Sequence, residues 1–102
     1  MDSRIKTIAD HYSYEAQSRQ CMEECAELIQ AINKLWRALE FDGENTVKVE
    51  ECMENVIGEL ADAQIMLWQM QYFAEIEGYE TQEEINSKLD RQMQRIKEES
   101  HV

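Results

Sequence analysis

Two acidic residues, Glu59 and Asp62, stand in a segment that is otherwise strongly hydrophobic, residues 56–68. A carboxylate in apolar surroundings must be neutralised, paired with a cation or bound to a metal, because burying a bare charge costs several kcal/mol. No lysine or arginine occurs between Lys48 and Lys88, so the neighbouring sequence offers no pairing cation. The pattern therefore favours a metal site over a salt bridge.

A second acidic pair, Glu24 and Glu27, lies within residues 23–27. At about 100° per residue on a helix, both side chains project on one flank of an apolar stripe, in line with Gln20 and Lys34. If this helix packs antiparallel to the helix carrying the first pair, the four carboxylates face one another. Converging carboxylates repel unless divalent cations join them, and an all-oxygen ligand set favours Mg²⁺ or Mn²⁺.

Two other kinds of metal site fit these residues less well. Di-iron carboxylate bundles need a Glu-x-x-His motif on each of two helices, which this sequence does not provide. A zinc site is not expected, because no histidine lies near Cys21 and Cys25 at zinc-ligand spacing. About a fifth of the residues are acidic, so pairs at this spacing also arise by chance, and an edge of acids held by salt bridges is the alternative to a metal site.

The two acidic motifs carry a family resemblance. Glu-Glu-Cys-Ala-Glu at 23–27, followed by Glu-Leu-Ala-Asp at 59–62, resembles the EExxE…ExxD signature of the MazG-like all-α nucleoside triphosphate pyrophosphohydrolases. The similarity extends from about Ile5 through the last predicted helix. It implies hydrolysis of (deoxy)nucleoside triphosphates at the α–β linkage, which releases the monophosphate and pyrophosphate and serves nucleotide-pool sanitation.

The resemblance also implies roles for particular residues. Glu24, Glu27, Glu59 and Asp62 would bind Mg²⁺, with Mn²⁺ as the alternative ion, and the ion would hold the triphosphate and activate a water. Glu23 is the candidate for orienting that water. These five acidic residues form the expected catalytic set.

A triphosphate also requires cations from the protein. Lys34 lies on the same flank as the first helix's acidic pair, and Lys88, Arg91 and Arg95 share one face of the last predicted helix. In so acidic a chain, three bases on one face are candidates for a phosphate clamp, and the alternative is that they pair with acids of the preceding helix. Three amide side chains are candidates for contacting the substrate base: Gln17, Gln20 and Asn33.

The elements that must position these residues are helices. The sequence has no proline, only three glycines and no strand-like alternation, so the prediction is an all-α fold. Ser13 is the expected N-cap of the second helix, and Gly43 and Gly78 are the expected left-handed C-caps of the second and third. Four helices are predicted, at residues 3–11, 13–40, 46–78 and 81–100.

The apolar positions of these helices predict an oligomer. The middle of the third helix, residues 56–73, is hydrophobic on nearly every side, which one partner helix cannot cover. The second and last helices have narrower stripes, formed by Cys21, Cys25, Leu28, Ile32, Leu35, Trp36 and Leu39, and by Ile85, Leu89, Met93 and Ile96. We expect a single MazG-like domain over residues 1–102. Two long antiparallel helices, with shorter N- and C-terminal helices, would complete their core as a homodimer or homotetramer.

Composition excludes several partners. The chain of 102 residues has a net charge of −12, so nucleic acid and anionic membrane surfaces are not expected. No stretch approaches the roughly 18 apolar residues of a membrane span, and Met1–Lys6 lacks the apolar core of a signal peptide. Together with three cysteines expected to be reduced thiols, this favours a cytoplasmic location.

Two other functions stay open at this point. One is a non-catalytic acidic helical protein that acts in interaction or regulation. The other is a phosphoribosyl-ATP pyrophosphohydrolase-type activity, which is the same cleavage on a related substrate.

Overall fold

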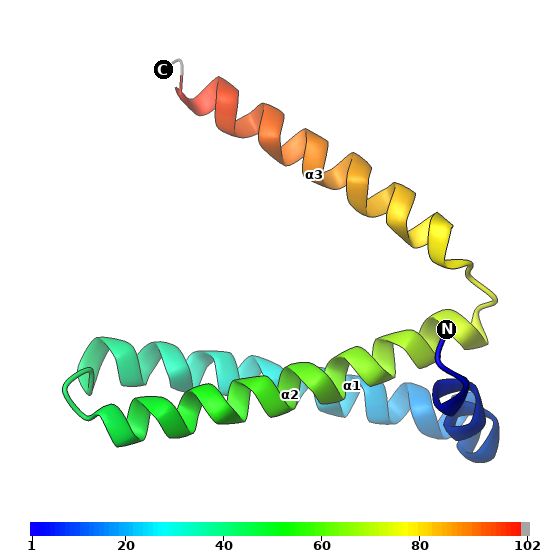
Figure 1. Cartoon of the computed structure of the whole chain (residues 1–102), viewed down its shortest axis with the longest axis horizontal. Helices are drawn as coiled ribbons and strands as arrows, with labels where there is room; N and C mark the ends of the chain where they lie inside the picture. Colours follow the sequence, from blue (N-terminus) through cyan, green and yellow to red (C-terminus); the bar gives the residue numbers. More distant parts are fainter. Residues whose placement is uncertain (101–102) are drawn as a thin grey trace.

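The computed structural model describes residues 1–100 and consists of three helices: α1 (Ser3–Phe41), α2 (Thr46–Phe73) and α3 (Gly78–Ser100). No strand occurs in these residues, which confirms the all-α prediction. The helices α1 and α2 run antiparallel as a hairpin, and α3 leads away from it (Figure 1). Within the described residues, no helix is both long enough and apolar enough to cross a membrane.

The predicted break near the start of the chain is present as a kink inside α1. Ser13 has φ 81° and ψ 161°, a conformation that non-glycine residues rarely adopt. The short segment before the kink packs through its buried residues Ile5 and Ala9. Its Asp10 carboxylate accepts a hydrogen bond from the Tyr72 hydroxyl at 2.7 Å, which ties the segment to the end of α2.

The loop between α1 and α2 lies where the sequence places it, but Gly43 is not a left-handed cap. No glycine among residues 1–100 has a positive φ. The C-cap is Asp42, whose backbone N–H donates to the carbonyl oxygen of Ala38 at 2.9 Å. A Cβ at Gly43 would lie 3.0 Å from the carbonyl oxygen of Leu39, so glycine serves a close backbone approach here.

The end of α2 also differs from the prediction. The left-handed residue is Glu75, with φ 57°. The N–H of Ile76 donates to the carbonyl of Gln71 at 3.0 Å and the N–H of Glu75 to that of Tyr72 at 3.1 Å, which together form a Schellman motif. The expected helix to Gly78 is therefore wrong, because this motif satisfies the last carbonyls earlier and Gly78 begins α3.

The contact between α1 and α2 follows a heptad pattern. Buried and half-buried residues recur at alternating steps of three and four, the spacing of an antiparallel coiled coil. We call these positions the seam: Gln17, Cys21, Glu24, Leu28, Ala31, Leu35 and Ala38 on α1, and Val49, Cys52, Val56, Glu59, Ala63, Met66 and Met70 on α2. Two carboxylates, one from each helix, thus occupy positions that coiled coils usually fill with apolar residues.

The predicted apolar stripe of the second helix is partly wrong. Ile32, Trp36 and Leu39 are 52–57% exposed, whereas the seam uses Ala31 and Ala38, each 1% exposed. The apolar surface of α1 is wider than one partner helix can cover. The small alanines let α2 approach closely, and the larger side chains beside them stay outside the hairpin.

A buried amide pair joins the two helices towards the open end of the hairpin. Gln17 Nε2 donates to Gln69 Oε1 at 2.8 Å, and Gln69 is only 1% exposed. Buried polar groups destabilise a fold unless they are paired, so this hydrogen bond favours one register of α1 on α2 over its neighbours. It also engages Gln17, which the sequence suggested as a contact to a substrate base.

Replacing Gln69 by alanine tests this pair. The change leaves the Gln17 amide unpaired in a buried site, so we expect the free energy of unfolding in urea to fall by about 1–3 kcal/mol at fixed protein concentration. Gln30→Ala, at an exposed position of α1, is the matched control and should change it by less than about 0.5 kcal/mol. Equal effects of the two substitutions would contradict a structural role for the pair.

Candidate functional site

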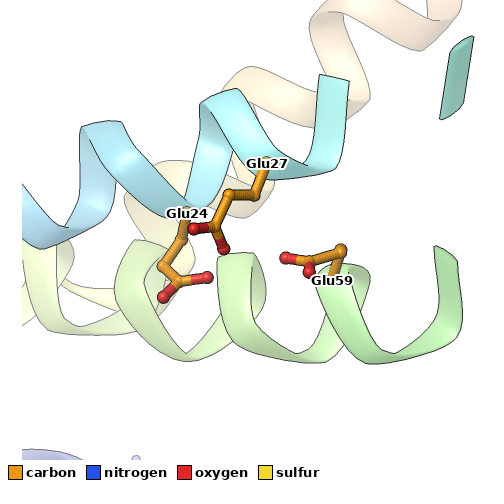
Figure 2. A group of neighbouring side chains, drawn as sticks. All are labelled: Glu24, Glu27 and Glu59. Carbon is orange, nitrogen blue, oxygen red and sulfur yellow. The ribbon is translucent and has the colours of Figure 1, made fainter. Parts of the chain in front are cut away.

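Three of the predicted ligand carboxylates meet between α1 and α2. Figure 2 shows Glu24 and Glu27 extending from α1 towards α2, with Glu59 on α2 beside them. One oxygen atom from each of the three carboxylates lies within 4.8 Å of the others. The structure therefore brings side chains from both acidic motifs, 35 positions apart at Glu24 and Glu59, into one cluster, which we call the glutamate triad.

The seam positions two members of the triad. Glu24 and Glu59 are both seam residues and are half-buried, whereas Glu27 lies one turn further along α1 and is exposed. Gln20, one turn before Glu24, donates from Nε2 to Glu24 Oε1 at 2.7 Å. Gln20 was predicted to contact substrate, and in this structure it orients a carboxylate of the triad.

One oxygen of each seam glutamate has no partner. Glu24 Oε2 and Glu59 Oε2 are buried and accept no hydrogen bond within residues 1–100. The ion pairs formed within residues 1–100 use other acids: Asp2, Asp42 and Glu84. Buried polar atoms are ordinarily paired. These two oxygens are therefore the atoms of the site that a proton or a cation from outside the chain would stabilise most.

The charges of the triad act on one another. The charge of Glu24 raises the pKa of Glu27 above its usual value, and desolvation and the charges of Glu59 and Glu23 raise it further. A raised carboxyl pKa means that the charged form is disfavoured where it stands. The arrangement is thus electrostatically unfavourable when all three groups are ionised and no cation lies between them.

The geometry is compatible with a small hard cation. Oxygens that bind one Mg²⁺ at about 2.1 Å can be at most about 4.2 Å apart, close to the 4.8 Å limit within which the triad oxygens lie. Acidic groups of this kind are also common on protein surfaces without an ion, so the cluster alone does not establish a metal.

Five of the predicted site residues lie on one side of the hairpin, next to the seam. Each of them directly precedes a seam residue, and we call this side of the hairpin the polar flank: Gln20, Glu23, Glu27, Lys34 and Asp62. Asp62, the fourth predicted ligand, is exposed and is not a member of the cluster, because it follows Glu59 by one turn and turns out of the seam. Glu23 is likewise exposed.

The predicted cations do not contact the triad. Lys34 is exposed on the polar flank and forms no ion pair with residues 1–100. Lys88 pairs with Glu84 of its own helix at 3.3 Å, rather than with an acid of the preceding helix. Arg91 and Arg95 lie on α3, which leads away from the hairpin (Figure 1). The predicted phosphate clamp is therefore not assembled within one chain.

A cleft of the described residues lies away from the triad. It has a volume of about 880 Å³ and lies between the N-terminal segment and the junction of α2 and α3, where Lys6, Trp68, Tyr72 and Gly78 are among its lining residues. None of the three glutamates lines it.

Comparisons with protein-family models, with curated proteins and with solved structures found no match for this chain. The family resemblance of residues 23–27 and 59–62 thus stays a prediction. The convergence of Glu24, Glu27 and Glu59 is a separate observation, made on the geometry of the folded chain.

Because the pKa of Glu27 is raised, replacing its side chain by a neutral one should increase the stability of the protein in a pH-dependent way. A carboxyl whose folded pKa lies above its unfolded value destabilises the fold as the pH rises through that range. In EDTA, Glu27→Gln should therefore raise the melting temperature at pH 7, and the gain should vanish near pH 3.5, where Glu27 is protonated in both states.

The matched control is Glu40→Gln, at an exposed position of α1 outside the cluster. Its melting temperature should differ little from that of the wild type at either pH. A gain for Glu27→Gln that is the same at both pH values would contradict the electrostatic explanation.

Proposed function

We propose that the protein is a Mg²⁺- or Mn²⁺-dependent nucleoside triphosphate pyrophosphohydrolase that converts (deoxy)nucleoside triphosphates to the monophosphate and pyrophosphate. The observation that supports this most is the glutamate triad, formed by both predicted motifs. Two of its oxygens are buried without a partner. An enzyme that binds a triphosphate through a cation needs a carboxylate cluster of this kind, open to solvent on one side.

In this proposal each side chain of the site has a separate role. Glu24 and Glu59 hold the ion from the seam, Gln20 keeps the Glu24 carboxylate oriented, and Glu27 completes the ligand set from the polar flank. The bound ion supplies polarisation of the phosphoryl oxygens and a lower pKa for an attacking water. Rigid placement of the seam glutamates by two packed helices makes the site preorganised for one ion position.

The polar flank is the proposed path for the substrate. Asp62 and Glu23 border the triad there and are available to a second ion or to the attacking water. Lys34 stands two turns beyond Glu27 on the same flank, a distance of about 10 Å along the helix. It is the hairpin's best-placed cation for the far end of a triphosphate.

Self-association is part of the proposal. The hairpin leaves many large apolar side chains exposed, which favours the homodimer or homotetramer expected from the sequence. The cytoplasmic location and the role in nucleotide-pool sanitation stay predictions.

Metal binding has a readout that is independent of catalysis. Mg²⁺ or Mn²⁺ should raise the stability of the wild-type protein, by about 2.7 kcal/mol when the ion is at a hundred times its Kd. Glu59→Gln should lose most of this ion-induced shift, although its stability in EDTA is expected to rise. Glu54→Gln, an exposed acid of the same helix, should keep the full shift, and an equal shift in all three proteins would exclude a specific site.

Catalysis is tested by pyrophosphate release from a panel of nucleotides that includes dCTP, dUTP and phosphoribosyl-ATP. We expect release that EDTA abolishes and that falls at least about 100-fold in kcat/KM for Glu24→Gln and Glu59→Gln, while Glu54→Gln stays near wild type. Preferred turnover of phosphoribosyl-ATP would identify the related activity. No release from any substrate would favour the non-catalytic interaction protein.

A further inference from the structure

The helix α3 has an apolar side with nothing against it. Its stripe consists of Ile85, Leu89, Met93 and Ile96, which are 43–59% exposed. None of the residues of α3 is buried. In Figure 1 the helix, coloured yellow to red, diverges from the hairpin along its whole length. An amphipathic helix in this position gains no stability from its apolar side unless something else covers it.

Hydrogen bonds on both sides of the junction define the end of α2 and the start of α3. On the α2 side, Glu75 is left-handed and the N–H of Ile76 donates to the carbonyl of Gln71 at 3.0 Å. On the α3 side, the N–H of Glu77 donates to the Glu80 carboxylate at 2.8 Å, as in one half of a capping box. These hydrogen bonds fix where α2 ends and where α3 begins. No residue of α3 is buried, so in this arrangement its own hairpin leaves the stripe uncovered and available to another molecule.

The hairpin carries a matching surface on the side opposite the polar flank. Large apolar residues that directly follow seam positions, each 46–68% exposed, form what we call the apolar face: Met22, Ile29, Ile32, Trp36 and Leu39 on α1, and Met53, Ile57, Leu60 and Leu67 on α2. In an antiparallel pair, the positions that follow the seam on the two helices lie on the same side. The face is thus continuous across both helices.

The exposed area is larger than a monomer of this mass carries. A folded chain of 12.1 kDa is expected to expose about 6,000 Å², whereas this one exposes 8107 Å². The excess is about 2,000 Å² per chain. Summed over two associating copies, it lies within the 2,000–5,000 Å² that obligate homodimers typically bury. A second copy is the occupant that covers both the stripe and the apolar face at once.

We propose that α3 is an exchanged arm: its stripe packs on the apolar face of a second copy, and the partner's arm does the same in return about a two-fold axis. This inference rests on the proposed self-association and specifies its interface. Charge complementarity supports it, because Lys88 and Arg95 lie beside the stripe on one side of α3. The exposed acid Glu50 directly follows a seam residue and borders the apolar face near the tip of the hairpin.

The exchanged arm also gives a role to basic residues of α3. Lys88 and Arg95 lie beside a stripe that needs the apolar face, whereas Glu27 of the triad lies on the polar flank, on the other side. These two bases therefore serve the interface between copies, and Lys34 is left as the triphosphate contact of the hairpin.

Sedimentation of the full chain tests the arm. The wild type should be a dimer at micromolar concentration, and Leu89→Asp with Met93→Asp should raise the dissociation constant at least about 100-fold. Ser87→Asp with Gln94→Asp adds the same charge on the opposite side of α3 and is the matched control, which should stay dimeric. The ion-induced stability shift should persist in both double variants, because α3 does not contact the triad.

A photoreactive residue at position 93, in a mixture of two differently tagged copies, distinguishes exchange from folding back. We expect crosslinks that join the two tags and map to the apolar face. A dimer unaffected by Leu89→Asp with Met93→Asp, or crosslinks confined to one chain, would overturn the exchanged arm while leaving self-association standing. A wild type that is monomeric at these concentrations would overturn both.

Discussion

The structure depends on two glutamates placed in the seam of a helix pair. Glu24 and Glu59 occupy heptad positions that otherwise bring apolar or small residues together, and each keeps one buried oxygen without a partner. Desolvating carboxylates at such positions is unfavourable unless a proton or a cation compensates them. The hairpin around them is held by small alanines and a paired amide, so it cannot easily rearrange to expose these groups fully to water. We infer that the site is retained for binding rather than for stability.

One register also divides the hairpin into two unlike sides. Most residues that directly precede the seam are polar and include Glu27 and Asp62, and most that directly follow it are large and apolar, such as Ile32 and Trp36. Substrate chemistry and self-association therefore use opposite sides of the same two helices. A dimer built through the apolar face leaves the triad open. This separation makes the two proposals compatible and also separately testable.

Much of the fold follows from the sequence. The breaks at Ser13 and in the loop after Phe41, and the meeting of acids from two helices, were predictable because helix breakers and charged residues in apolar segments are strong signals. The seam itself was not predictable in full. Ala31 and Ala38 carry less hydrophobicity than Ile32 and Trp36, so the pattern favours the wrong stripe. The end of α2 was missed because its left-handed residue is a glutamate, which gives no local signal for positive φ.

The central claim is that a divalent cation joins the carboxylates of α1 and α2. The most direct measurement is an anomalous difference map from crystals grown with Mn²⁺ and a non-hydrolysable triphosphate. The account predicts a peak within coordination distance of Glu24, Glu27 and Glu59, with the phosphate oxygens completing its ligands. A map without a peak there, in which these carboxylates instead pair with lysine or arginine side chains, would contradict it.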